Sequence, residues 1–183
     1  MSVLFINACV RANSRTLVLA KDFLAGCNGE IVELNLEKEG ILPLDKELLE
    51  KREQLISKEN WNDKMFCYAR QFANADEIVI AAPFWDLGFP ALLKIYVEAI
   101  TVSGITFRYN EGRPQGFCKA KKLTYITTSG GEIHADFGYS YIKTLAQNFY
   151  GISETQCIRA ENLDVDCISA EEVMTKAKIT KTK

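Results

Sequence analysis

The chain has 183 residues, a formal net charge of −2 at pH 7, 48% hydrophobic residues and 25% charged residues. This composition is typical of globular proteins, and the length predicts one domain over residues 1–183. The small negative charge provides no broad basic field, so nucleic acid and anionic membranes are excluded as expected partners.

The N-terminus lacks the basic region and cleavage segment of a signal peptide, and no stretch approaches the roughly 20 apolar residues of a membrane helix. We therefore expect a cytoplasmic protein. The six cysteines are widely spaced and His134 is the one histidine, so the sequence predicts no metal site. Such cysteines are usually small core residues. Cys9 is singled out from this set because it follows the first strand and lies in a candidate site loop.

The first half of the chain alternates strand and helix patterns. Residues 3–6 form a short apolar run typical of a central strand, and apolar spacing predicts a helix over residues 16–24. Residues 30–36 alternate as a less buried strand. Asp45 then caps a charged surface helix over residues 46–57.

The second half continues the alternation. Helical spacing over residues 61–72 leads to the clearest buried strand, 78–82, and to a helix over 91–101 with Pro90 in its first turn. Residues 104–121 lack helical periodicity and form an excursion outside the core. A strand at 123–128, a helix at 137–150 and a last strand at 152–159 follow. Ser169 and Glu172 resemble a capping box that opens a helix ending near Lys178.

These elements predict a three-layer, doubly wound α/β fold with helices on both faces of a five-stranded parallel sheet in the order 2-1-3-4-5. Ligands of such sheets bind at the carboxyl ends of the strands, where the strand order switches. Three loops should therefore form a site: residues 7–16, 83–88 and 128–134.

The first loop carries Arg11, Ser14, Arg15 and Thr16 at the start of a helix, where hydroxyls, backbone amides and positive charge suit a phosphate. Ser14 and Thr16 are equally suited to be helix caps, but the two arginines favour an anion. The loop has neither a G-x-x-x-x-G-K-[ST] nor a G-x-G-x-x-G pattern, so a mononucleotide is favoured over the ligands of those motifs.

The other two loops suit a flat ring. Phe84 and Trp85 follow a buried strand directly, which indicates contact with a ring system or with a partner subunit. Gly130 and Gly131 either let the backbone approach a ligand closely or simply form a turn at the end of a strand. His134 is either catalytic or a solvent-facing loop residue.

Three segments together resemble the FMN-dependent NADH:quinone oxidoreductase and azoreductase family: APFWDLGFPALLKIYVE (82–98), GITFRYNEGRPQGF (104–117) and ITTSGG (126–131). The resemblance implies a flavodoxin-like fold and a homodimer with FMN at its interface. It also implies ping-pong, two-electron transfer from NADH or NADPH to quinones, azo compounds or similar small acceptors. The flavin carries that chemistry, so no catalytic side chain is assigned with certainty, and His134 is the one candidate.

The resemblance also assigns the cofactor site. The phosphate would lie on the first loop, and the ring between the second and third loops. The implied FMN-binding residues are Arg11, Ser14, Arg15, Thr16, Pro83, Phe84, Trp85, Asp86, Leu87, Thr128, Ser129, Gly130 and Gly131. Tyr109 either shapes the partner's pocket or is a packing residue. The first loop departs from the family pattern, because Cys9-Val10-Arg11 replaces a serine-rich stretch.

Two other classes of function stay open. A flavodoxin-like FMN electron carrier would share the fold and cofactor but serve protein partners, usually through a strongly acidic docking face that a net charge of −2 does not favour. A cofactor-free binding module would keep the fold with a lost site.

Overall fold

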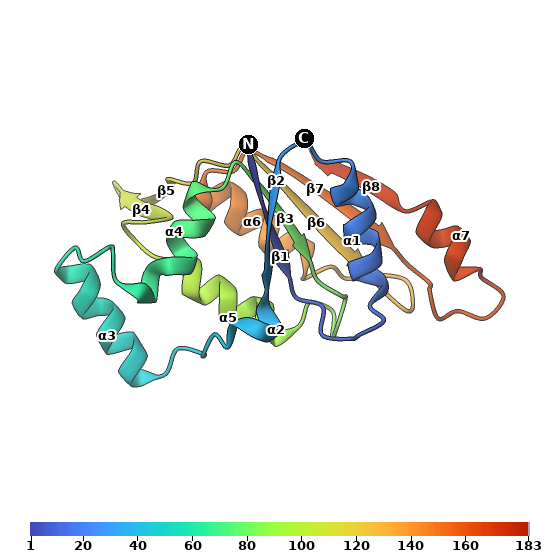
Figure 1. Cartoon of the computed structure of the whole chain (residues 1–183), viewed down its shortest axis with the longest axis horizontal. Coiled ribbons are helices and arrows are strands. Elements are labelled where there is room, and N and C mark those ends of the chain that lie inside the picture. Colours follow the sequence, from blue (N-terminus) through green and yellow to red (C-terminus); the bar gives the residue numbers. More distant parts are fainter. Residues whose placement is uncertain (183) are drawn as a thin grey trace.

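The computed structural model describes residues 1–182, with side chains described through Ala177. Its centre is a six-stranded sheet in the order β2-β1-β3-β6-β7-β8 (Figure 1). The first five of these strands pair in parallel, which confirms the predicted 2-1-3-4-5 order. The strands of the sheet are β1 (Ser2–Asn7), β2 (Glu30–Asn35), β3 (Glu77–Ala81), β6 (Lys122–Thr128), β7 (Glu154–Ala160) and β8 (Lys178–Thr182).

Helices cover both faces of this sheet (Figure 1). One face packs against α1 (Arg15–Ala25) and α7 (Ala170–Thr175). The other face packs against α4 (Cys67–Asn74), α5 (Ala91–Ile100) and α6 (Tyr139–Leu145), and the short α2 (Leu36–Glu39) follows β2. Within residues 1–182, none of the helices has the length and apolar character needed to cross a membrane.

The central strands are buried because both of their faces are covered. On β1, Val3 and Phe5 join the core on the α1 side, whereas Leu4 and Ile6 join the core on the α5 side. β2 lies at the sheet edge, and only Leu34 of its residues is buried, as its alternating sequence predicts.

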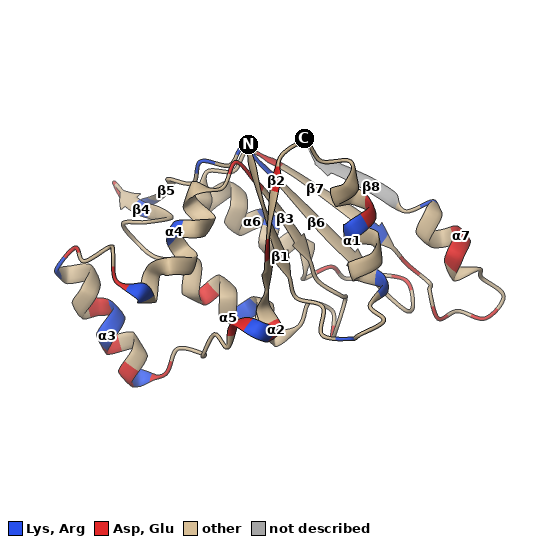
Figure 2. Cartoon of the chain, in the orientation of Figure 1, with Lys and Arg blue, Asp and Glu red and all other residues tan. Residues whose placement is uncertain are grey.

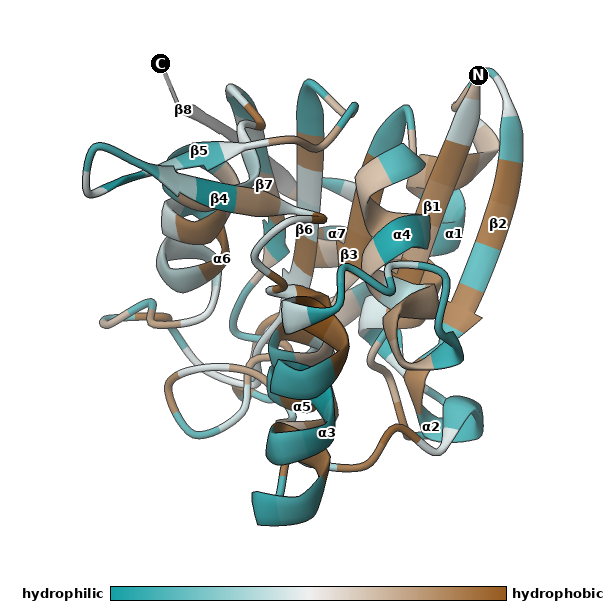
Figure 3. Cartoon of the chain, turned by 90° about the vertical axis from the view of Figure 1, so that its left-hand side faces the viewer, coloured by the Kyte–Doolittle hydropathy of each residue, from teal (hydrophilic) through white to brown (hydrophobic). Residues whose placement is uncertain are grey.

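The surface helix predicted at residues 46–57 is α3 (Lys46–Ser57). The Asp45 carboxylate caps it by accepting a hydrogen bond from the backbone N–H of Leu48 at 2.8 Å. No residue of α3 is buried. The helix carries charges of both signs (Figure 2) and is largely hydrophilic (Figure 3), which fits its position away from the sheet.

Two predicted helices differ from the observed ones. The segment predicted as a helix from residue 61 forms a 3₁₀ turn at η1 (Lys64–Phe66) before α4, because the Arg70 guanidinium holds the carbonyls of Trp61 and Asp63 in an irregular turn. The helix predicted over 137–150 consists of α6 and a π turn, η2 (Ala146–Tyr150), which ends at Gly151 in the left-handed region with φ 76°.

The C-terminal predictions need correction. The strand at 152–159 is not the last, because β8 pairs antiparallel with β7 at the edge of the sheet. The helix opened by Ser169 ends at Thr175 and does not reach Lys178. Ser169 does cap α7, since its Oγ accepts from the backbone N–H of Glu172 at 3.3 Å. The strand β8 has only one apolar residue, Ile179, so it lacked a hydrophobic signal.

The predicted excursion at residues 104–121 contains an antiparallel hairpin of β4 (Phe107–Asn110) and β5 (Arg113–Gly116). The hairpin lies outside the main sheet, as predicted, but it is anchored to the core. Phe107 is buried and its ring packs edge-on against Phe149, with ring centroids 5.2 Å apart. Tyr109 on the same strand is exposed.

Asp76 makes the stability of the fold dependent on pH. The Lys119 ammonium and the backbone N–H of Ser2, which donates at 2.7 Å, lower the pKa of Asp76 from its usual 3.8 to about 2. The carboxylate therefore stabilises the folded state above pH 4, and this contribution is lost as the pH falls through about 2. We expect the free energy of unfolding to fall more between pH 5 and about pH 2 in the wild type than in Asp76→Asn.

Urea unfolding at several pH values measures this difference. Asp22→Asn is the control, because it removes an exposed carboxylate from α1. The control should keep the pH dependence of the wild type. If Asp76→Asn also keeps it, the carboxylate does not contribute as described.

Candidate functional site

A pocket of about 330 Å³ lies at the carboxyl ends of β1, β3 and β6, where the three predicted loops meet. The point where the strand order switches lies between β1 and β3, so the pocket is where a doubly wound sheet binds its ligands. The pocket brings together ten predicted site residues with three others, and is lined by Arg11, Asn13, Ser14, Arg15, Thr16, Pro83, Phe84, Trp85, Thr128, Ser129, Gly130, Leu163 and Asp164.

The two hydroxyl groups of the first loop have structural roles as well as a place in the pocket. Ser14 is the N-cap of α1, and its Oγ accepts from the backbone N–H of Leu17 at 3.2 Å. The Thr16 hydroxyl is buried and lies 2.6 Å from the hydroxyl of Thr128. This hydrogen bond ties the start of α1 to the end of β6, so the first and third loops are held together at the base of the pocket.

The two arginines of the first loop are held in different ways. Arg11 is exposed, and its guanidinium lies over the ring of Trp85, 5.7 Å from the ring centroid. Arg15 donates to the backbone carbonyl of Leu163 at 2.8 Å and to the Asp164 carboxylate at 2.7 Å. Arg11 thus joins the first loop to the second, and Arg15 joins it to the segment after β7.

That segment is the part of the pocket that the sequence did not predict. Leu163 and Asp164 follow β7, the fifth parallel strand, whose carboxyl end lies at the same edge of the sheet. This position was the available signal, because every parallel strand delivers its following loop to that edge. Asn13, also missed, lies within the predicted first loop.

The second loop makes a tight two-residue turn between Trp85 and Gly88. Trp85 and Gly88 exchange backbone hydrogen bonds of 3.4 and 2.7 Å. Asp86 and Leu87 have φ values of 50° and 64°, a left-handed conformation that favours glycine or asparagine and is strained for leucine. Asp86 and Leu87 form the exposed tip of this turn and do not line the pocket, whereas Trp85 does.

The two glycines of the third loop also differ, because Gly130 lines the pocket and Gly131 does not. A Cβ on Gly130 would lie 2.5 Å from Oδ2 of Asp164, so the close approach at this glycine is to a side chain of the protein itself. A Cβ on Gly131 would meet nothing within 4 Å, and this residue does not line the pocket. Gly130 therefore has a packing reason to be glycine, and Gly131 has none in this structure.

His134 is exposed and lies outside the pocket lining. Its loop is nevertheless fixed. Arg159 on β7 lies 3.4 Å from both the Asp136 and the Glu161 carboxylates, and Glu161 accepts from the backbone N–H of Ile133 at 3.1 Å. The histidine is thus a solvent-facing residue on an anchored loop.

Cys9 is a buried residue of the first loop and does not line the pocket. Burial raises the pKa of its thiol, and Sγ lies 3.7 Å from the carbonyl oxygen of Ala81. These features are those of a packing cysteine. Cys118 and Cys157 are also buried, but Cys67 and Cys167 are exposed, so the prediction of core cysteines is wrong for those two. In the described part of the chain, no three His, Cys, Asp or Glu side chains are grouped to hold a metal ion.

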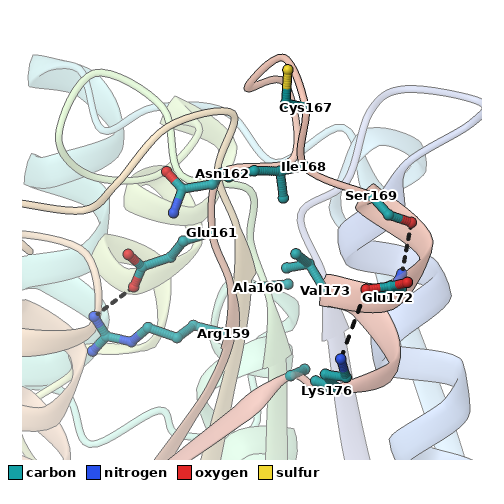
Figure 4. Close-up of a pocket in the computed structure, with 11 residues that line it drawn as sticks. Arg159, Ala160, Glu161, Asn162, Cys167, Ile168, Ser169, Glu172, Val173 and Lys176 are labelled. Carbon is teal, nitrogen blue, oxygen red and sulfur yellow. Dashed lines mark hydrogen bonds and ion pairs between the residues drawn. The ribbon is translucent and has the colours of Figure 1, made fainter.

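A second pocket, of about 440 Å³, lies between the end of β7 and α7 (Figure 4). Its charged side chains pair with one another: Lys176 lies 3.7 Å from Glu172, and Arg159 points toward Glu161 and away from α7. The smaller pocket instead combines two arginines, hydroxyls and aromatic rings from loops at the strand switch point. We therefore assign the candidate site to the smaller pocket.

The sheet order and the position of this pocket define a flavodoxin-like α/β protein, and the family described as having a flavodoxin-like fold matches residues 1–181. An FMN-dependent NADH:quinone oxidoreductase from Lachnoclostridium phytofermentans is 39% identical over 89% of this chain and 87% of its own length. The chain therefore belongs to the FMN-dependent NADH:quinone oxidoreductase family of flavodoxin-like proteins.

Solved structures agree with this fold. An azoreductase from Bacillus anthracis superposes with a TM-score of 0.85 at 24% identity, covering 96% of this chain and 94% of the other. An FMN-dependent NADH-azoreductase from Bacillus anthracis, solved in complex with FMN, superposes with a TM-score of 0.79 at 25% identity, covering 96% of this chain and 93% of the other.

Proposed function

We propose that this chain is an FMN-dependent oxidoreductase that uses NADH or NADPH to reduce quinones, azo compounds or similar small acceptors. The observation that carries the proposal is the pocket in which two arginines, the start of α1 and two aromatic residues converge. The names of its relatives, which specify FMN, NADH and quinone, support the same assignment.

The donors of the pocket suit a phosphate. Arg11 and Arg15 supply positive charge, and Ser14 and Thr16 supply hydroxyl groups. The first amides of an α-helix have no acceptor within the helix, so those of Arg15 and Thr16 at the start of α1 are available to an anion. This donor set fits the FMN phosphate.

The remaining lining suits a flat ring. Phe84 and Trp85 are only partly buried and stand at the pocket beside Thr128, Ser129 and Gly130. In the proposal, the backbone of these two loops would hydrogen-bond the isoalloxazine ring, and Trp85 would contact the ring or pack against a partner subunit. The hydride and two-electron transfers, taken in ping-pong order, are the chemistry of the cofactor when it is bound.

The proposal includes a homodimer with the cofactor at its interface. Leu87 and Phe137 are 53% and 65% exposed, and they are adjacent, since the Phe137 N–H donates to the Leu87 carbonyl at 3.1 Å. Large apolar side chains exposed together at the edge of a site favour coverage by another protein surface. Tyr109, which is 61% exposed on the hairpin, is a further candidate for contact with the partner's pocket. A cytoplasmic location stays a prediction from the sequence.

Consumption of NADH separates the enzyme from the electron carrier. We expect the FMN-loaded protein to oxidise NADH or NADPH continuously when a water-soluble quinone or an azo dye is the only acceptor. No second protein should be needed, because in the proposal both small molecules react with the bound flavin in turn. Turnover that depends on a separate reductase protein would instead establish the flavodoxin-like carrier. The same assay, run with both nucleotides and a panel of acceptors, ranks the substrates.

A further inference from the structure

Arg15 was expected to meet a phosphate, but its guanidinium is already occupied by acceptors of the protein. One amino group donates to the Asp164 carboxylate at 2.7 Å, and the other donates to the Leu163 carbonyl at 2.8 Å. Arg15 and Asp164 both line the pocket. An internal carboxylate therefore stands where the proposed site requires an anion.

The segment that carries Asp164 is held firmly against the third loop. The backbone N–H of Leu163 donates to the Ser129 carbonyl at 3.1 Å, and that of Asp164 donates to the Gly130 carbonyl at 3.0 Å. Leu163 is buried. The Asp164 side chain lies over Gly130, where a Cβ would come within 2.5 Å of its Oδ2. The carboxylate is thus positioned by the fold beside the Arg15 guanidinium.

The ion pair between Arg15 and Asp164 can open at little cost in stability. The side chains of Arg15 and Asp164 are 46% and 66% exposed, and exposed ion pairs contribute little to stability. A phosphate monoester carries more charge than a carboxylate at neutral pH and offers three acceptor oxygens to the same guanidinium. A phosphate can therefore displace Asp164 from Arg15.

We propose that Asp164 competes with the cofactor phosphate for Arg15 and so sets the affinity of the pocket for phosphorylated flavin. The proposal rests on the assignment of FMN to this pocket. Asp164 neutralises Arg15 while no phosphate is bound, and a phosphate must replace this carboxylate to use the guanidinium. Riboflavin has no phosphate, so its affinity is independent of the competition.

Titration of flavin-free Asp164→Asn with FMN and with riboflavin tests this competition through quenching of flavin fluorescence. The substitution keeps the size of the side chain and removes its charge. We expect FMN to bind about threefold to tenfold more tightly than to the wild type, while riboflavin affinity changes by less than about twofold. Asp166→Asn is the matched control, because it removes the same charge from an exposed position in the same segment. The control should leave both affinities within about twofold of the wild type.

Unchanged or weaker FMN binding by Asp164→Asn would overturn the proposal. An equal gain in riboflavin affinity would also overturn it, because it would indicate a change in pocket shape. Inorganic phosphate provides a test that does not need flavin. Phosphate should raise the thermal midpoint of Asp164→Asn more than that of the wild type or of Asp166→Asn, and an equal rise in all three would also overturn the proposal. If the wild type binds no flavin, the assignment of FMN to the pocket is wrong. The phosphate titration then decides whether Asp164 competes with a phosphate for Arg15.

Discussion

Replacement of Gly116 by alanine is expected to destabilise the fold by about 3 kcal/mol or more, near the upper end of the cost of overpacking. A Cβ on Gly116 would lie 2.1 Å from both the backbone nitrogen of Gly151 and the carbonyl carbon of Tyr150. Both atoms belong to the main chain, so no side-chain rotation relieves the contact. The hairpin would have to separate from the end of η2, where the N–H of Cys118 donates to the Tyr150 carbonyl at 3.2 Å.

Thermal unfolding followed by circular dichroism measures this effect. For a chain of this length, the expected loss corresponds to a fall in the midpoint of roughly 6 to 12 °C. Gly131→Ala is the control, because a Cβ at Gly131 meets nothing within 4 Å and its φ is not positive. Equal midpoints for the two variants would show that the hairpin does not pack against Gly151 as described.

The double substitution Arg11→Ala and Arg15→Ala is expected to weaken FMN binding by about 100-fold or more. Charge-assisted hydrogen bonds contribute about 1.5 to 3 kcal/mol each, and about 1.4 kcal/mol corresponds to a factor of ten in affinity. Both arginines line the pocket, and Arg15 opens α1. Riboflavin affinity should change far less, because riboflavin lacks the group that the arginines bind.

A control for net charge is available in Lys21→Ala combined with Lys58→Ala. Both lysines are exposed, and neither lines the candidate pocket. This variant should bind FMN with an affinity within about threefold of the wild type, since charges far from a site are screened by salt. Equal losses in the two double variants would assign the effect to overall charge, and an equal loss of riboflavin affinity would assign it to a damaged pocket.

Much of the candidate site could be predicted because the fold follows from local patterns. Apolar runs at β1 and β3 and helical spacing in α1 and α5 define a doubly wound sheet, and such a sheet brings its loops together at one edge. The sequence therefore places Arg11 and Trp85 at that edge, and the family resemblance assigns Thr128 to the same site; all three line the pocket. The 82–98, 104–117 and 126–131 segments carry the resemblance to the family.

The features that were missed depend on contacts between distant parts of the chain. The fold places the loop after β7 at the edge of the site, but the backbone hydrogen bonds that bring Leu163 and Asp164 against Ser129 and Gly130 have no local sequence pattern. Leu87 adopts a left-handed conformation that its residue type disfavours, so the turn that removes it from the pocket lining had no sequence signal. β8 is mostly polar and pairs only at the sheet edge. The local propensities of the residues do not predict these features.

Titration of the purified, flavin-free protein with FMN tests the central claim most directly. The account predicts saturable quenching of flavin fluorescence at one FMN per chain, with weaker binding of riboflavin, and bleaching of the bound flavin by NADH or NADPH without another protein. A protein that takes up no FMN, or that binds FMN and riboflavin equally, would contradict the assignment of the phosphate to Arg11, Arg15 and the start of α1.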